Sequence, residues 1–121
     1  MTEKIFMSYA HQDRRYAKIV ERALRQQGIL VTDDVIFLDP HEHLKAGADF
    51  RKEIRAQITA ATKVVVVATA NAESSEWVNY EVGMADALGK PIVVVGRKGM
   101  GKSARFSKLS GVRSIEIPGE E

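Results

Sequence analysis

Apolar residues along this chain fall into two patterns, short continuous runs and longer segments with helical spacing. The runs 64–67 and 92–95 are apolar at every position, which is typical of central strands in a parallel sheet that is covered on both faces. Shorter runs near the two ends of the chain and in its first third predict further strands. In total, the pattern predicts strands at 4–9, 35–38, 63–69, 91–96 and 113–117.

The segments between these strands carry apolar residues every three or four positions, which predicts helices. The first helix covers 14–27, with Asp13 as a cap for its first turn. The second begins after Asp49, and the third runs from the serine pair 74–75 to Gly89, where glycine takes the left-handed conformation without a steric cost.

Because strand and helix alternate, the predicted class is α/β, a single doubly wound parallel sheet of five strands with helices on both faces. The expected strand order is the flavodoxin-like 2-1-3-4-5. The chain of 121 residues is expected to form one domain over 1–121. Only 118–121 follow the last predicted strand, so the usual last helix is missing from the pattern. Either the domain is the N-terminal part of a longer multidomain protein, or a partner subunit covers the open face.

Composition excludes several classes of protein. No apolar run approaches the roughly 20 residues that cross a bilayer, and no signal peptide is recognisable, so we expect a cytoplasmic protein without a membrane partner. With no cysteine, disulfides and thiolate catalysis are excluded. The segment 90–113 is basic, but it holds only one aromatic residue, Phe106, so nucleic-acid binding is not expected.

Glu81 is conspicuous within the third predicted helix. Trp77, Met84 and Leu88 recur at helical spacing, and Glu81 falls on the same stripe, four residues after Trp77. A carboxylate among apolar neighbours is costly unless it is paired or used by a site. A partly exposed glutamate, or one that pairs with an arginine, remains the alternative.

The expected strand order also predicts where a ligand would bind. The direction in which successive strands are added to the sheet reverses between the first and third strands. Ligands of open α/β sheets bind at the carboxyl ends of the strands at that point. The loops 9–13 and 70–77 meet there, flanked by 40–49. They hold residues that suit a nucleotide, namely Tyr9, Asp13, Arg14, Asp39, Gly47, Ser75 and Trp77.

Four motifs, in unbroken order, resemble those of Toll/interleukin receptor (TIR) domains. Residues 5–9, Ile-Phe-Met-Ser-Tyr, are similar to the Phe-Ile-Ser-Tyr opening of that family. Residues 37–39 and 44–47 are similar to its second strand and following loop. Residues 74–81 resemble its Ser-x-Trp-Val-x-x-Glu helix start, and 89–93 resemble the beginning of its fourth strand.

The resemblance implies a bacterial enzyme that cleaves NAD+ between nicotinamide and ribose, giving ADP-ribose or a cyclic variant. The family's catalytic glutamate corresponds to Glu81. The residue type fits, since a carboxylate can stabilise the oxocarbenium character that develops as an N-glycosidic bond breaks. NAD+ would be the substrate, with no cofactor and no metal. The implied substrate-binding residues are Ser8, Tyr9, Asp39, Gly47, Ser75 and Trp77.

The resemblance also implies activation by self-assembly, in a homo-oligomer or filament whose contacts involve the 40–49 loop. A fused or separate sensor domain would supply the trigger, in bacterial defence or signalling. The alternative is a non-catalytic TIR–TIR interaction module, since fold does not determine function. Adaptors of the family often lack the pair Trp77 and Glu81, so its presence favours the enzyme.

Other motifs point to different chemistry. Residues 96–103 satisfy the P-loop pattern Gly-x4-Gly-Lys-Ser, but too few residues follow for the strands of a P-loop protein, so a nucleotide-binding P-loop is a remote alternative. His41 and His43 lie near Asp39 without a third histidine close in sequence, which favours solvated loop residues over a metal site. A phosphoacceptor receiver domain needs an acidic pair at the end of its first strand, where this chain has Met-Ser-Tyr at 7–9, so that class of protein is rejected.

Overall fold

The five strands form a single parallel sheet in the order β2-β1-β3-β4-β5 in the computed structural model, which describes residues 3–38, 50–97 and 112–117. This order, and the doubly wound α/β class, confirm the prediction. The strands are β1 (Ile5–Ser8), β2 (Val35–Phe37), β3 (Lys63–Val67), β4 (Ile92–Arg97) and β5 (Val112–Ile117).

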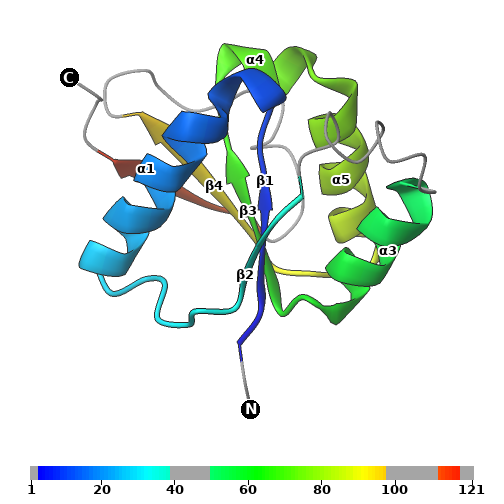
Figure 1. The fold of residues 1–121 in the computed structure, drawn as a ribbon, viewed down its shortest axis with the longest axis horizontal. Helices are drawn as coiled ribbons and strands as arrows, with labels where there is room; N and C mark the ends of the chain where they lie inside the picture. Colours follow the sequence, from blue (N-terminus) through cyan, green and yellow to red (C-terminus); the bar gives the residue numbers. More distant parts are fainter. Residues whose placement is uncertain (1–2, 39–49, 98–111, 118–121) are drawn as a thin grey trace.

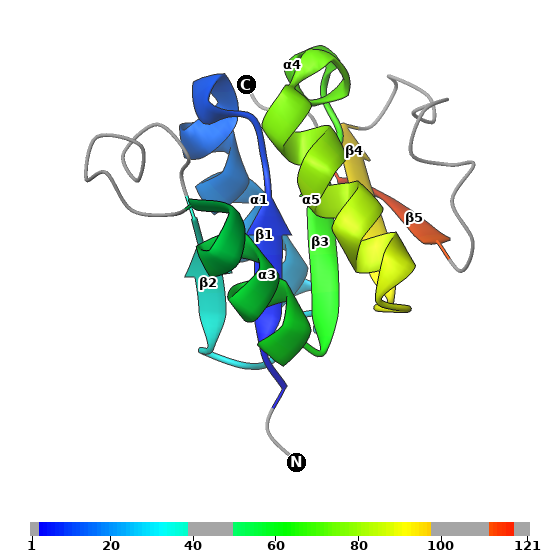
Figure 2. The same ribbon diagram turned by 90° about the vertical axis from the view of Figure 1, so that its right-hand side faces the viewer.

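Helices cover both faces of the sheet (Figures 1 and 2). One face packs against α1 (Arg14–Gln26), which follows the short 3-10 helix η1 (His11–Asp13). The other face packs against α3 (Phe50–Ala60) and α5 (Glu76–Ala87), while the short α4 (Ala70–Ser74) lies at the end toward which the strands point. In the described residues, no helix is both long and apolar enough to span a membrane.

The alternation of side chains along the strands divides the core into two layers. From β1, Ile5 and Met7 join the layer beneath α1, together with Val20 and Leu24. Phe6 joins the layer beneath α3 and α5. By the same alternation, Ser8 at the end of β1 faces the second layer, on the side of α5.

The helix predicted from 74–75 to Gly89 is in fact the second of two helices. Thr69 ends the loop after β3, and its side chain accepts a hydrogen bond from the backbone N–H of Ala72, which caps α4. Ser75 is then extended and caps α5. Gly89, with φ of 70°, follows the end of α5 as predicted. The sequence pattern missed α4 because five residues are too short to show helical periodicity.

The apolar stripe predicted for α5 is confirmed only in part. Leu88 is 40% exposed, and Trp77 and Met84 are only partly buried against the core. The buried side chains of α5 are Val78, Glu81, Val82 and Ala85. Glu81 therefore lies on the face of α5 that is buried against the sheet.

Several sequence predictions fall outside the described residues. These are the roles of Asp39 and Gly47, the assembly loop 40–49 and the pair His41 and His43. Of the P-loop-like motif, only Gly96 and Arg97 are described, and both belong to β4, where they pair with β5.

Candidate active site

The carboxylate of Glu81 is held at the carboxyl end of β1 by a buried hydroxyl. Ser8 Oγ donates a hydrogen bond to Glu81 Oε1 at 2.7 Å, across 73 residues of sequence. The two residues are 0% and 2% exposed, respectively. A partly exposed glutamate, the alternative considered from the sequence, is therefore excluded. A length of 2.7 Å is in the range of a charge-assisted O–H···O⁻ bond.

This pair lies at the point where the order of the sheet reverses. Strand β1 is flanked by β2 on one side and by β3 on the other, so the connections after β1 and β3 begin side by side at the same edge and lead to helices on opposite faces of the sheet. Ser8 is the last residue of β1, and Glu81 lies in the second turn of α5, which packs against this part of the sheet. The site thus lies where open α/β sheets bind ligands.

The start of α5 is built by a set of local hydrogen bonds. Ser75 Oγ accepts from the backbone N–H of Val78 at 3.2 Å. Asn79 Nδ2 donates to the backbone carbonyl oxygens of Ser75 at 2.7 Å and Glu73 at 3.1 Å, which fixes the junction of α4 and α5. Trp77 lies in the first turn, and its ring meets the Tyr80 ring edge-on, with 6.2 Å between centroids. Ser75 and Trp77 therefore precede Glu81 on one rigid segment.

Tyr9 does not lie beside Glu81. Its side chain follows Ser8 and so points to the opposite face of the sheet, where it is 6% exposed. Its ring packs against Phe37 with 6.0 Å between centroids, and Lys18 Nζ lies 3.7 Å from the centroid of the same Phe37 ring. The structure brings Ser8 together with Glu81, and places Tyr9 in the core layer beneath α1.

A second polar cluster at the same edge was not recognised from the sequence. Asp13 stands at the N-cap position of α1, but its side chain makes no capping hydrogen bond. Its Oδ2 instead accepts from Thr69 Oγ1 at 2.5 Å, and its Oδ1 accepts from Asn71 Nδ2 at 3.0 Å. The expected strand order contains the signal for this contact, because it places the loops after β1 and β3 side by side.

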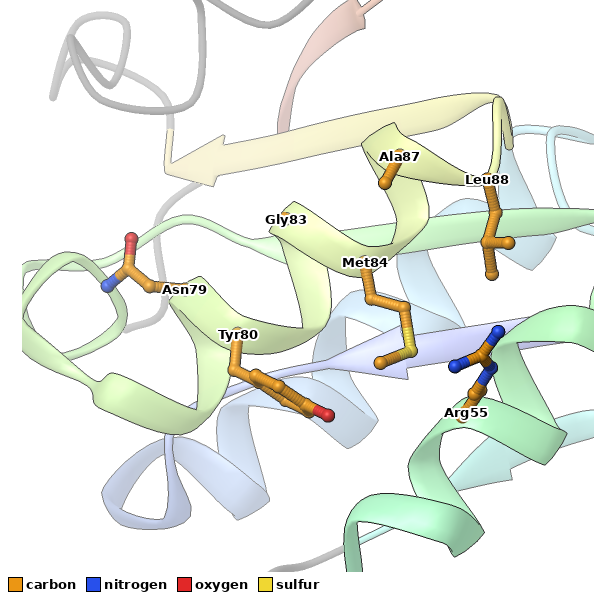
Figure 3. A pocket seen from close by; sticks show the side chains of 7 residues that line it. All are labelled: Arg55, Asn79, Tyr80, Gly83, Met84, Ala87 and Leu88. Atoms are coloured by element: carbon orange, nitrogen blue, oxygen red, sulfur yellow. The ribbon is translucent and has the colours of Figure 1, made fainter.

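A groove between α3 and α5 opens on the outer surface (Figure 3). Its volume is about 430 Å³. The lining is Arg55 from α3 together with Asn79, Tyr80, Gly83, Met84, Ala87 and Leu88 from α5 and its end. Of the predicted site residues that the structure describes, none lines this groove, so the groove is separate from the Ser8–Glu81 pair.

The chemistry available to the pair follows from its environment. A buried carboxylate interacts strongly with any positive charge that develops beside it, because little water screens the interaction. It can also accept hydrogen bonds from sugar hydroxyls. Within 3–38, 50–97 and 112–117, no three His, Asp or Glu side chains gather as metal ligands would. The described site is therefore suited to stabilising cationic character in a bound molecule.

The fold and this edge of the sheet define a doubly wound α/β domain with a carboxylate site at its switch point. The model of the TIR domain family matches residues 5–117, so the chain belongs to the TIR family. This agrees with the resemblance carried by the sequence motifs.

The solved structures that share the fold include the following two. One is that of a CMP N-glycosidase, BcmB, from Clostridium botulinum, with a TM-score of 0.62, 16% identity, and coverage of 97% of this chain and 91% of the other. The second is a flavodoxin-like domain from Synechococcus sp., with a TM-score of 0.50, 16% identity, and coverage of 98% and 85%. Among curated proteins, no significant match is found.

Proposed function

We propose that this TIR domain is an NAD+ glycohydrolase that cleaves the bond between nicotinamide and ribose. The observation that carries the proposal is the buried carboxylate of Glu81, held by Ser8 at the carboxyl end of β1. Family membership supports it, since Glu81 stands where the resemblance places the family's catalytic glutamate. The fold shared with a protein named as an N-glycosidase supports the same class of reaction.

The reaction needs little from the protein beyond charge stabilisation. The bond from ribose C1′ to the pyridinium nitrogen breaks, and its electron pair passes to nicotinamide, which leaves as a neutral molecule. Positive charge develops on C1′ and the ring oxygen, and Glu81 stabilises it or holds the ribose hydroxyls. Water then adds to C1′ and releases a proton, which yields ADP-ribose. An internal nucleophile in place of water would give a cyclic product.

Activation by self-assembly is the second part of the proposal. Glu81 is 2% exposed, so a ribose reaches it only after neighbouring side chains move. Contacts between copies, with the 40–49 loop taking part, would stabilise that open arrangement. Such a requirement suits a defence or signalling enzyme in the cytoplasm, which is active only after a sensor has brought copies together.

A nucleotide N-glycosidase acting on a pyrimidine nucleotide is the second candidate. The solved structure with the TM-score of 0.62 is named as a CMP N-glycosidase, which favours this candidate. CMP, like NAD+, contains an N-glycosidic bond between a base and a ribose. Cytosine is a poorer leaving group than nicotinamide, so this reaction would need a proton donor beside the base. The third candidate is the non-catalytic TIR–TIR module, for which the glutamate would be structural.

The test is to incubate concentrated protein with NAD+ or with CMP and to follow release of nicotinamide or cytosine by chromatography. Glu81→Gln keeps the shape of the side chain and removes its charge. Glu76→Gln is the matched control, because Glu76 is an exposed glutamate in the first turn of the same helix. We expect nicotinamide release by the wild type and by Glu76→Gln, and none by Glu81→Gln.

Each other outcome selects a different function. Release of cytosine alone would move the assignment to the nucleotide N-glycosidase. Equal nicotinamide release by Glu81→Gln and the wild type would mean that Glu81 is structural and that the proposal is wrong. Absence of release from either substrate, in concentrated protein and on a surface that clusters the chains, would leave the interaction module.

A further inference from the structure

The carboxylate of Asp13 connects the two loops that meet at the switch point. Its two oxygens accept hydrogen bonds from the Thr69 hydroxyl and the Asn71 amide, which lie 56 and 58 residues away in sequence. An aspartate at an N-cap usually accepts from the first turn of its own helix, and here it does not. We refer to Asp13, Thr69 and Asn71 as the Asp13 clasp.

Thr69 transmits this contact into α4. Its hydroxyl donates to Asp13 Oδ2 and accepts from the backbone N–H of Ala72 at 3.0 Å. Because the hydroxyl hydrogen points at the carboxylate, its lone pairs are free to accept from the helix. One side chain therefore ties the start of α4 to the loop that follows β1.

The connection continues from α4 into α5. The backbone N–H of Ser75 donates to the carbonyl oxygen of Ala72 at 3.1 Å, and the Ser75 side chain caps α5. The Asn79 amide donates back to the carbonyl oxygens of Glu73 and Ser75. These bonds leave α4 and the first turn of α5, with Trp77, little freedom to move independently.

We propose that Asp13 is a positioning residue, which through the clasp sets the place of α4 and of the first turn of α5 at the site. The consequence for catalysis rests on the proposed function and on the resemblance to the family, which implies that Trp77 binds the substrate. Asp13 is not a catalytic residue, because both of its carboxylate oxygens already bind protein groups. The hydrogen bond from Ser8 to Glu81 involves no residue of the clasp, so we expect the clasp to act mainly on Trp77 in the first turn of α5 and less on the carboxylate one turn further on.

The chain offers a matched control for the clasp. Thr62 and Thr69 flank β3 at its two ends, and both hydroxyls bond to residues beside β1. Thr62 Oγ1 accepts from the Lys4 backbone N–H and donates to the Lys4 carbonyl oxygen, each at 3.0 Å, at the amino edge of the sheet. Thr62→Val and Thr69→Val are therefore matched variants, each of which removes one threonine hydroxyl, at opposite edges of the sheet. Asp13→Ala breaks the clasp and leaves the cap of α4 in place.

Trp77 is the single tryptophan of the chain, so its fluorescence reports on the first turn of α5 without reference to activity. We expect Asp13→Ala and Thr69→Val to change the emission wavelength and to increase quenching by acrylamide, while Thr62→Val leaves both unchanged. In the double variant the effects should not add, as for residues in one network. Thr69→Ser, which keeps the hydroxyl, should restore the wild-type emission.

Nicotinamide release gives the second readout. We expect Asp13→Ala to lower kcat/KM by about 10- to 100-fold, because a small misplacement of a binding wall has effects of that size. Most of the change should appear in KM, since Ser8 still holds Glu81. A loss confined to kcat would mean that Asp13 takes part in the chemical step, and would overturn the positioning role.

The two proposals fail in different ways. If the wild type releases no nicotinamide, the proposed function fails, and Trp77 fluorescence still decides whether the clasp positions α5. If Asp13→Ala and Thr62→Val have the same emission, quenching and unfolding midpoint, the clasp has no positioning role, whatever the activity. A fall in the unfolding midpoint of Asp13→Ala without a change at Trp77 in the folded state would lead to the same conclusion.

Discussion

The two ends of strand β3 are tied to β1 in different ways. At the amino end, the Thr62 hydroxyl bonds to backbone groups of Lys4, which any chain offers, and a partly exposed ion pair joins Lys63 to Glu3 at 3.1 Å. At the carboxyl end, Thr69 bonds to the side chain of Asp13, and the side chain of Ser8 at the end of β1 bonds to Glu81. A backbone partner only extends the sheet, whereas a side-chain partner must be a particular residue from a distant segment.

The difference shows at which edge of the sheet buried polar side chains from distant segments pair with each other. Contacts between distant side chains restrict the sequence at both partners, and a buried carboxylate is costly in addition. A domain that needed only stability could replace the Ser8–Glu81 pair with apolar residues, as buried ionic groups often can be. The Ser8–Glu81 pair lies at the carboxyl edge, where ligands bind in such sheets, and a functional site would require polar residues there.

The largest expected effect is on activity, at the carboxyl edge. Glu81→Gln should lower nicotinamide release by at least about 100-fold, since it removes the charge aimed at the developing cation. The unfolding midpoint should stay the same or rise, because a neutral side chain is easier to bury. Chromatography and thermal unfolding of the same samples check both statements. A large loss of stability together with the loss of activity would contradict the functional role.

Ser8→Ala should have the next largest effect. It leaves Glu81 Oε1 in the interior without this donor, which costs about 1–3 kcal/mol of unfolding free energy. Ser74→Ala is the control, because Ser74 is exposed and its hydroxyl bonds only to backbone carbonyls. Urea unfolding of the two variants measures the difference. If Ser8→Ala were no less stable than Ser74→Ala, the bond to Glu81 would contribute nothing to the fold.

Thr62→Val tests the amino edge and should have a smaller effect. It removes two hydrogen bonds, but both are exposed and water can replace them, so the total loss should be about 0.5–1.5 kcal/mol. Nicotinamide release by the folded protein should not change. The same assays as for Ser8→Ala apply. A loss of activity at this distance would mean that the whole β1–β3 pair, and not one edge of it, determines the site.

The smallest effect is expected in the groove between α3 and α5. Leu88 is 40% exposed there, and Leu88→Ser should change the unfolding free energy by no more than about 0.5 kcal/mol, as for other surface substitutions. At a protein concentration where chains do not associate, activity should be unchanged. If activity fell only under clustering conditions, sedimentation of both proteins would show whether this surface takes part in assembly.

Much of the fold could be predicted from local patterns. The apolar runs of β3 and β4 mark central strands, and the spacing along α1 and α3 marks their buried faces. The helix α4 was not predicted, because its five residues are fewer than the window in which helical periodicity can be recognised. On α5, Trp77 and Met84 are only partly buried and Leu88 is 40% exposed, because Val78, Val82 and Ala85 form the buried face of the helix.

The site was predictable only in part. Glu81 could be recognised as unusual, and its motif resembles that of the family, but its partner Ser8 was expected to contact substrate. The resemblance implies that Tyr9 binds the substrate. The pleat of the strand directs its side chain to the face opposite Ser8, and its role in binding stays a prediction. Asp13 was expected to cap α1, and its pairing with Thr69 depends on how the loops after β1 and β3 approach each other.

The class of fold and the number of strands follow from the sequence alone, because they depend on periodicity and alternation within short windows. The expected strand order then indicates the carboxyl edge beside β1 and β3 as the place to expect a site. Only the tertiary structure decided which polar groups meet there. Ser8 and Glu81 are 73 residues apart, and Asp13 and Thr69 are 56 apart. Whether such side chains touch depends on the rotation of α5 and the approach of two loops. Packing of the whole core sets both of these.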